Sequence, residues 1–317
     1  MNSNQRFHLG RANHHVRTGN VRHALRHIQK CQFGTNGMTA LIIVDVQNCF
    51  LPGGSLETTD KDDADATKLI RGIIDKLKTS EDTAVYVTKD SHPKNHISFE
   101  GRISPTKPEG DGLSAFVDKR EAPHYEQSIR NWTEKTKEQD VWPKHCACTK
   151  QGTVLDGYSD LNDKGKLGCD LPEDLQGALN HFNGLVGYVS KGFDENIDSY
   201  SAVADAIGKP TPELMHLKLR DETMTGERSF LAHLNKAGYD RIDVCGIARD
   251  KCVLWTAMDL LEYLTSPTEV SFLYDLTRPV IAGKPGLDVT KEDIKTMVAE
   301  AAKKEPRILE KKTFTVV

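Results

Sequence analysis

The sequence predicts an α/β fold with a doubly wound, mostly parallel sheet of five to six strands and helices on both faces. One reason is a set of short apolar runs rich in β-branched residues, of which residues 40–46 (ALIIVDV) are the first. Such runs are typical of strands buried on both faces of a parallel sheet. The other reason is that these runs alternate with amphipathic helical patterns, an order that implies right-handed crossovers between parallel strands.

The expected elements follow this alternation along the chain. After the first strand, residues 62–78 carry apolar side chains at helical spacing, which predicts a helix with one buried face. Further apolar runs and amphipathic stretches extend the pattern. They predict strands at 83–88, 185–190, 241–245, 270–274 and 313–317, and helices near 227–237, 251–263 and 290–303.

The connections between these elements are uneven in length. Residues 100–182 are polar, charged and rich in Pro and Gly, and we expect long surface connections there that include part of a lid. Residues 155–178 and 206–226 look like charged insertions. One α/β core with long loops accounts for the length of the chain, so we expect a single domain over residues 38–317.

The first 37 residues differ in composition from the rest, with six Arg or Lys and no Asp or Glu. We interpret residues 1–37 as a basic, disordered extension in front of the domain. Apolar residues within 21–28 have helical spacing, so targeting to an organelle is an alternative interpretation. Nucleic-acid binding is disfavoured because the basic residues lack interleaved aromatic side chains.

Composition argues against other classes of protein. Hydrophobic residues make up 38% of the chain, and no apolar run approaches the roughly 18 residues that cross a bilayer, so no membrane association is expected. Seven cysteines without a secretory signal are expected to be reduced thiols. The sequence has no CxxC pair, which leaves a structural zinc ribbon without support.

Four polar residues come where parallel strands are expected to end, and such strand ends meet at one edge of a sheet. They are Asp45, Asp90, Lys191 and Cys252. Cys252 is expected in the first turn of a helix, where the helix dipole stabilises a thiolate. Asp45 could accept the thiol proton and Lys191 could hold the pair in register, which predicts an Asp-Lys-Cys catalytic triad.

A second group contains Asp90 and His92, because residues two apart in an extended segment project to the same side. His145, with His96 as a further candidate, would complete a set of three or four N/O ligands. Such a set suits a divalent metal, with zinc as our first choice and iron or manganese as alternatives. Open coordination positions would then receive water or substrate.

Six separated segments together resemble the isochorismatase-like cysteine hydrolases and, within them, the nicotinamidases. The resemblance covers about residues 38–317 apart from the charged insertions. It departs from the family pattern at Cys49, where Asp is common, and at Ser91, where an aromatic residue is frequent. The segments are 40–50 (ALIIVDVQNCF), 88–99 (TKDSHPKNHISF), 142–146 (WPKHC), 190–203 (SKGFDENIDSYSAV), 244–257 (VCGIARDKCVLWTA) and 273–279 (LYDLTRP).

The resemblance assigns roles to the residues that match the family motifs. Phe50 and Trp142 match aromatic walls that sandwich the substrate ring, whose nitrogen would bind the metal. A cis peptide bond between Ile247 and Ala248 is also implied, and it would aim the amides of Ala248 and Cys252 at one point as an oxyanion hole. The implied triad is Asp45, Lys191 and Cys252, and the implied metal ligands are Asp90, His92 and His145.

The reaction implied by the resemblance is hydrolysis of nicotinamide to nicotinate and ammonia in cytoplasmic NAD salvage, with a homo-oligomer left open. The nearest alternative is a related cysteine amidohydrolase acting on a carbamoyl or ureido compound. An isochorismate-type hydrolase is disfavoured because it does not use a cysteine nucleophile. A non-catalytic metal-binding interaction protein is the alternative from a different class.

Overall fold

The computed structural model describes residues 37–58, 63–79, 82–96, 98–99, 142–148, 165–195, 197–205, 213–219, 222–224, 229–280 and 289–317. Residues 1–36 of the expected basic extension lie outside this part of the chain. So do residues 100–141, which include much of the expected lid, and residues 155–164 of the first expected insertion.

A single sheet runs through the described residues, with eight strands in the order β5-β4-β3-β2-β1-β6-β7-β8. In the part of this order that runs β3-β2-β1-β6-β7-β8, every neighbouring pair is parallel, so the predicted parallel sheet is confirmed with six strands. These strands are β1 (Thr39–Val44), β2 (Ala84–Asp90), β3 (Leu185–Lys191), β6 (Arg241–Ile247), β7 (Thr268–Arg278) and β8 (Lys312–Val316).

Two antiparallel strands extend the sheet beyond β3, in a stretch expected to be an insertion. They are β4 (Glu213–Leu219), which pairs with β3, and β5 (Glu222–Met224), which pairs with β4. The sequence of β4, ELMHLKL, has no continuous β-branched run because antiparallel outer strands need not be apolar throughout. The described sheet therefore has eight strands, of which the six parallel ones match the predicted sheet.

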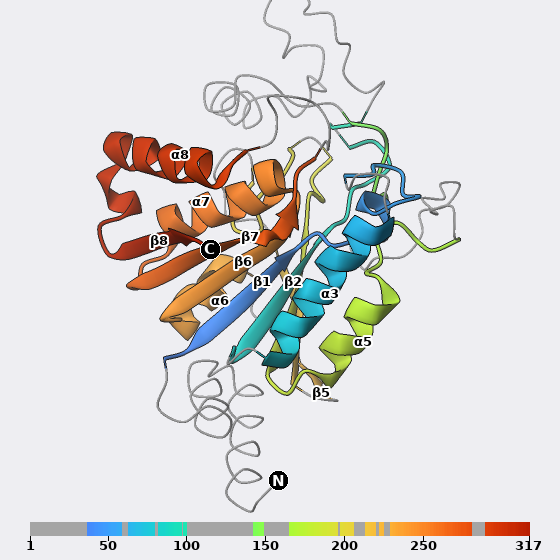
Figure 1. Cartoon of the computed structure of the whole chain (residues 1–317), viewed down its shortest axis with the longest axis horizontal. Coiled ribbons are helices and arrows are strands. Elements are labelled where there is room, and N and C mark those ends of the chain that lie inside the picture. The colour runs from blue at the N-terminus through green and yellow to red at the C-terminus, as the bar shows by residue number, and fades with distance from the viewer. Residues whose placement is uncertain are drawn as a thin grey trace, which may run out of the picture.

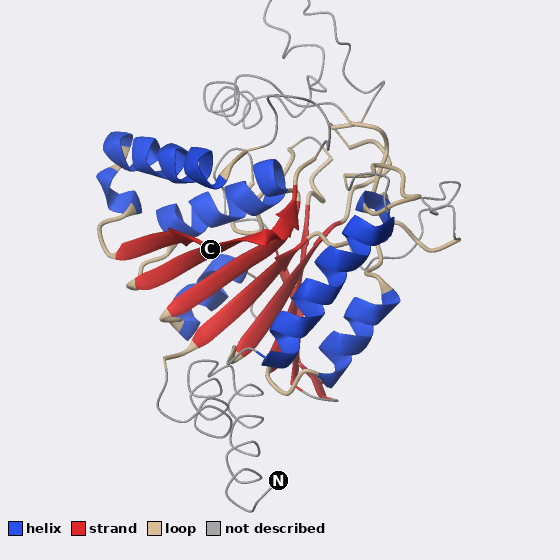
Figure 2. Cartoon of the chain, in the orientation of Figure 1, coloured by secondary structure: helices blue, strands red, loops and turns tan. Residues whose placement is uncertain are grey.

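Helices cover both faces of the sheet, as predicted (Figures 1 and 2). One face carries α3 (Asp63–Thr79) and α5 (Glu173–His181). The opposite face carries α6 (Phe230–Ala237), α7 (Leu254–Tyr263) and α8 (Lys291–Lys304). Alternate residues of β1 pack against the two helix layers: Leu41 lies on the α3 side of the sheet and Ile42 on the α7 side.

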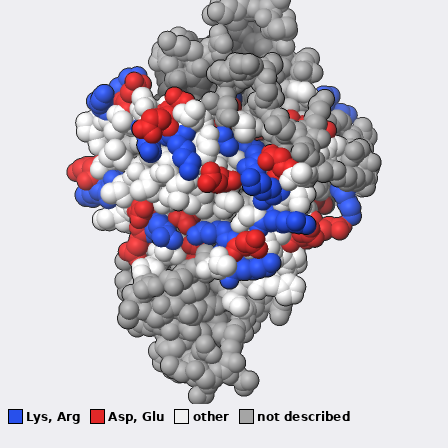
Figure 3. Space-filling model, in the orientation of Figure 1, with Lys and Arg blue, Asp and Glu red and all other residues white. Residues whose placement is uncertain are grey.

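The helix α5 lies within residues 100–182, where we expected only surface connections. Its buried residues are Leu175 and Leu179, one turn apart, so its apolar stripe is too narrow to predict a helix from periodicity. Within the described residues, no helix has both the length and the apolar character needed to cross a membrane. On the face shown in Figure 3, basic and acidic side chains are interspersed.

The strand order places a topological switch point between β1 and β6. From β1 the chain moves outward through β2 to β3, and it later returns to β6 on the other side of β1. Helices then lie on opposite faces on the two sides of this point, which leaves a crevice beyond the carboxyl ends of the strands. The candidate site occupies this position.

Candidate active site

The four predicted strand-end residues meet at the carboxyl edge of the sheet. Asp90 and Lys191 are the last residues of β2 and β3, and they are register partners. Asp45 directly follows β1 with a positive φ of 49°. Thr88 holds Asp45 there: its hydroxyl accepts from the Asp45 amide at 3.1 Å and donates to Asp45 Oδ1 at 2.6 Å.

Lys191 lies at the centre of the group, and its ammonium is buried. Its Nζ is 2.7 Å from Asp45 Oδ2 and also contacts Asp90 Oδ1. The same atom donates to the carbonyl of Ser199 at 3.1 Å and lies 3.5 Å from Cys252 Sγ. One cation therefore links the predicted triad to a predicted metal ligand.

Burial sets the protonation of this group. It raises the pKa of Asp45 to about 6, with Lys191 opposing and Asp90 reinforcing the change. It also raises the pKa of the Cys252 thiol, which Lys191 opposes. Burial disfavours the charged form of Lys191, but Asp45 and Asp90 outweigh it and raise the pKa of Lys191. The arrangement therefore favours a thiol beside a carboxylate and an ammonium.

Cys252 lies in the first turn of a helical segment, as expected, but its burial raises the pKa of the thiol and disfavours the expected thiolate. Cys252 lies in a π-helical turn, η2 (Arg249–Val253), and the α-helix begins only at Leu254. The predicted cis peptide bond between Ile247 and Ala248 is present just before this turn. The carbonyl of Ala248 accepts hydrogen bonds from the amides of Lys251 and Val253, which fixes the backbone around the thiol.

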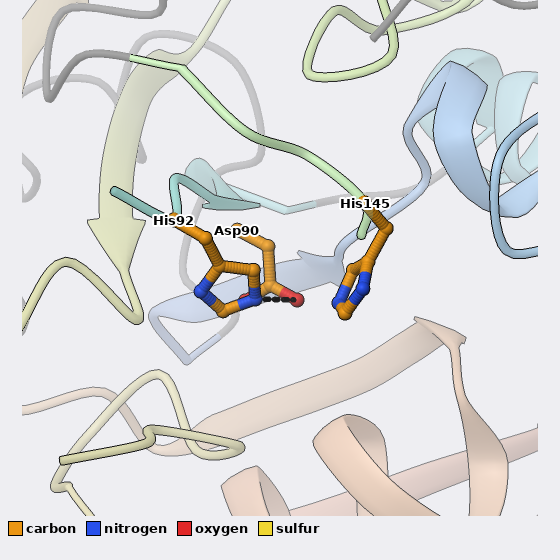
Figure 4. Close-up of side chains that lie close together, drawn as sticks. All are labelled: Asp90, His92 and His145. Atoms are coloured by element: carbon orange, nitrogen blue, oxygen red, sulfur yellow. Dashed lines mark ion pairs between the residues drawn. The ribbon is translucent and has the colours of Figure 1, made fainter. Parts of the chain in front are cut away.

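Asp90, His92 and His145 point toward one another, with ligand atoms all within 4.8 Å (Figure 4). His92 Nδ1 lies 2.8 Å from the carbonyl of Gly192, and His145 Nδ1 lies 2.7 Å from that of Pro143. Each ring therefore keeps Nε2 for a ligand, the arrangement usual in metal-binding histidines. Burial and His92 lower the pKa of His145 to about 3, which favours the neutral imidazole that binds metals.

His96 belongs to a neighbouring set that shares His92. The ligand atoms of His92, His96 and Asp198 also lie within 4.8 Å of one another. Among the described residues, His96 Nε2 is buried without a hydrogen-bond partner and lies 3.9 Å from Asp198 Oδ1. The described structure thus brings all four predicted N/O donors together, with Asp198 as a fifth that we did not predict.

A pocket with an empty volume of about 430 Å³, open solvent included, lies against these groups. Its lining includes Phe50, Trp142, Ala248 and Cys252, so the predicted aromatic, oxyanion and nucleophilic positions share one cavity. The indole of Trp142 donates to Tyr200 Oη at 3.2 Å.

Several residues of the site were not among those predicted from the sequence. One is Thr88, which holds Asp45 as described. Another is Gln47, whose side-chain amide accepts a hydrogen bond from the backbone amide of Asp90 at 2.8 Å and donates one to the backbone carbonyl of Asp90 at 2.9 Å. Asp198, Tyr200 and Lys251 line the pocket. All five lie inside the motifs that carry the family resemblance, which is the signal that could have identified them.

A disulfide between Cys49 and Cys146 corrects the expectation that every cysteine is a reduced thiol. The two residues are 97 positions apart, so sequence spacing gave no sign of the pairing. Cys49 precedes Phe50 in the 3-10 turn η1 (Asn48–Phe50), and Cys146 follows His145. The bond therefore joins the segments that carry a pocket wall and a candidate ligand.

No family model matches the chain. The nicotinamidase of Acinetobacter baylyi is 31% identical over 220 residues, covering 69% of this chain and 73% of that protein. The nicotinamidase/pyrazinamidase of Mycobacterium tuberculosis is 30% identical over 246 residues, covering 77% and 89%. The structure of the yeast nicotinamidase bound to nicotinaldehyde shares the fold, with a TM-score of 0.53 at 23% identity over 82% of this chain and 96% of that one. In agreement with its motifs, the chain is an amidohydrolase that belongs to the nicotinamidase family.

Proposed function

We propose that this enzyme hydrolyses nicotinamide to nicotinate and ammonia. The observation that carries the proposal is the position of Lys191, which contacts Asp45 and reaches Cys252 Sγ at 3.5 Å beside a pocket with aromatic walls. Membership of the nicotinamidase family supports the choice of substrate. The nicotinate would enter pyridine nucleotide salvage in the cytoplasm.

The three triad residues divide the work. Asp45 removes the proton from Cys252 while Lys191 holds the two in register, and the sulfur attacks the carboxamide carbon. The amides of Ala248 and Cys252 stabilise the resulting oxyanion. Asp45 returns the proton to the leaving ammonia and then activates the water that hydrolyses the thioester.

The substrate ring is held between Phe50 and Trp142 in this proposal. Asp90, His92 and His145 would hold a divalent metal, zinc first and iron or manganese as alternatives. Their two imidazoles and one carboxylate are a donor set that suits such an ion. When bound, the metal would coordinate the pyridine nitrogen and so direct the carboxamide toward Cys252.

Ammonia release from nicotinamide tests the proposal. The zinc-loaded chain should be active, and Cys252→Ala should lose activity by about 10⁴-fold or more because the nucleophile is removed. A version that starts at Met38 should retain activity, since we assign residues 1–37 to a dispensable extension outside the hydrolase domain. No release by the zinc-loaded wild type would overturn the proposed substrate, and ureido and carbamoyl compounds would be tried next.

Metal dependence is tested separately with a chelator. Removal of the metal should abolish turnover, and addition of zinc should restore it. The metal content of His145→Ala and Asp90→Ala proteins should fall, because each loses one of three ligands. Full metal content in both variants would show that the ion is held elsewhere.

A further inference from the structure

Lys251 brings a positive charge to the pocket. It precedes Cys252 in the turn η2, its side chain is half-buried, and it is one of the pocket-lining residues. Among the described residues that line the pocket, it is the one Lys or Arg. Lys191 is not among the lining residues and serves the triad, so Lys251 is the cationic side chain that the described residues bring to the cavity.

The ammonium of Lys251 is located beside an aromatic wall. Its Nζ is 6.0 Å from the centroid of the Trp142 ring and 5.7 Å from that of Tyr200. These two rings are hydrogen-bonded to each other, so they form one surface. Cation–π attraction acts at such distances and favours this position of the ammonium.

The substrate and the product of the proposed reaction differ in charge. Nicotinamide is neutral, whereas nicotinate carries a carboxylate at the position where the amide was. A cation at the wall of a partly desolvated pocket attracts the carboxylate and has little effect on the binding of the neutral amide.

We propose that Lys251 is a specificity-determining residue that favours anionic pyridine carboxylates, the reaction product first among them. The inference rests on the proposed function, because it uses the pocket between Phe50 and Trp142 as the ring site. It predicts inhibition by nicotinate that depends on Lys251. Pyridine carboxamides with an additional carboxylate should bind better than their neutral analogues for the same reason.

Calorimetric titration of the zinc-loaded Cys252→Ala protein measures binding of both compounds without turnover. Adding Lys251→Met should raise the dissociation constant of nicotinate about fivefold, the scale of one partly exposed ion pair, and that of nicotinamide less than about twofold. Lys251→Arg should keep the preference because it keeps the charge. Lys295→Met, which removes an exposed lysine paired with Glu292 on α8, is the matched control and should change neither constant.

Raising the salt concentration should reduce the affinity of the Cys252→Ala protein for nicotinate. It should have little effect on that affinity once Lys251→Met is added. If Lys251→Met changes the dissociation constants of nicotinate and nicotinamide equally, or changes neither, the role of Lys251 is overturned and the proposed reaction still stands. If the Cys252→Ala protein with Lys251 intact binds neither compound, both proposals fail together.

Discussion

At the scale of single residues, the site depends on buried polar groups that are partners of one another in space. Lys191 contacts two carboxylates, a carbonyl and a thiol, and Asp45 depends on the hydroxyl of Thr88 as well as on this ammonium. Such a network is stable only when each buried charge keeps its partners. Residues that never touch substrate should therefore affect the reaction strongly.

Thr88 provides the first test at this scale. Its hydrogen bond favours the charged form of Asp45, whose pKa burial has raised to about 6. The proposed base must be ionised, so activity should fall as the pH drops below that pKa. Thr88→Val should move this acid limb to higher pH and lower kcat/KM near neutrality about tenfold.

Thr88→Ser keeps the hydroxyl and is the matched control for the pH profile. It should leave the acid limb where it is in the wild type. An acid limb that does not move in Thr88→Val would show that another group limits the rate at low pH.

His233 provides a test of stability. It lies buried in α6, with Nε2 2.7 Å from Tyr86 Oη, and burial together with Lys236 lowers its pKa from 6.5 to about 3. The folded state therefore holds a neutral imidazole while the unfolded chain takes up a proton below about pH 6.5. This contribution to stability is present above pH 6.5 and is lost as the pH falls toward 3.

His233→Gln should remove this dependence. The wild type should lose about 4 kcal/mol of unfolding free energy between pH 6.5 and 3.5 from this group alone, in addition to the acid loss that both proteins share. Urea titrations at several pH values measure the difference. His181→Gln, at an exposed position, should keep the wild-type slope, and an equal slope in His233→Gln would contradict the assignment.

At the scale of elements, helices with clear ends were easier to predict than those without. The helix α8 begins with a capping box, in which Thr290 Oγ1 accepts from the Asp293 amide and Asp293 accepts from the Thr290 amide. Its predicted range of 290–303 is within one residue of the observed one at each end. The short helix α5 starts after Pro172 without a side-chain cap and was missed.

Thr290→Ala should therefore destabilise the protein by about 1 kcal/mol, because it leaves the amides of the first turn without their side-chain acceptor. Thr290→Ser keeps the side-chain acceptor and should lower the unfolding free energy by only a few tenths of that amount. Urea denaturation at neutral pH is the measurement. Equal stability of the alanine and serine variants would mean that solvent replaces the cap.

At the scale of the whole molecule, the disulfide between Cys49 and Cys146 is the one covalent link within the described residues that joins distant parts of the chain. It closes a loop between residues 97 positions apart, and it flanks both Phe50 and His145. Its loss should therefore affect both unfolding and the candidate metal site.

Cys49→Ser should lower the unfolding free energy by about 2–4 kcal/mol under non-reducing conditions, since the unfolded chain regains the entropy of an open loop. A dithiol reductant converts the protein disulfide to two thiols by exchange and is itself oxidised to a disulfide, so it should lower the stability of the wild type by a similar amount. The same reductant should have little effect on Cys49→Ser. A large effect on that variant would locate the sensitive bond elsewhere.

The sequence by itself determined the parallel core and the types of residue at its carboxyl edge. Runs such as 40–46 are typical of central strands buried on both faces, and the carboxyl ends of parallel strands meet at one edge. Asp45, Asp90, Lys191 and Cys252 were therefore expected to approach that edge. The motifs around them then indicated the family.

Tertiary structure alone decided how these residues meet. Four features depend on contacts between residues far apart in the chain. They are the cavity beside Lys251, the hydrogen bonds from Gln47 to Asp90, the pairing of Cys49 with Cys146 and the protonation of the predicted triad. Local sequence patterns report the period and ends of an element, whereas pKa values and side-chain contacts depend on burial and on neighbours from other elements. For this reason the sequence could predict which residues reach the site but not that Cys252 would lie there as a buried thiol.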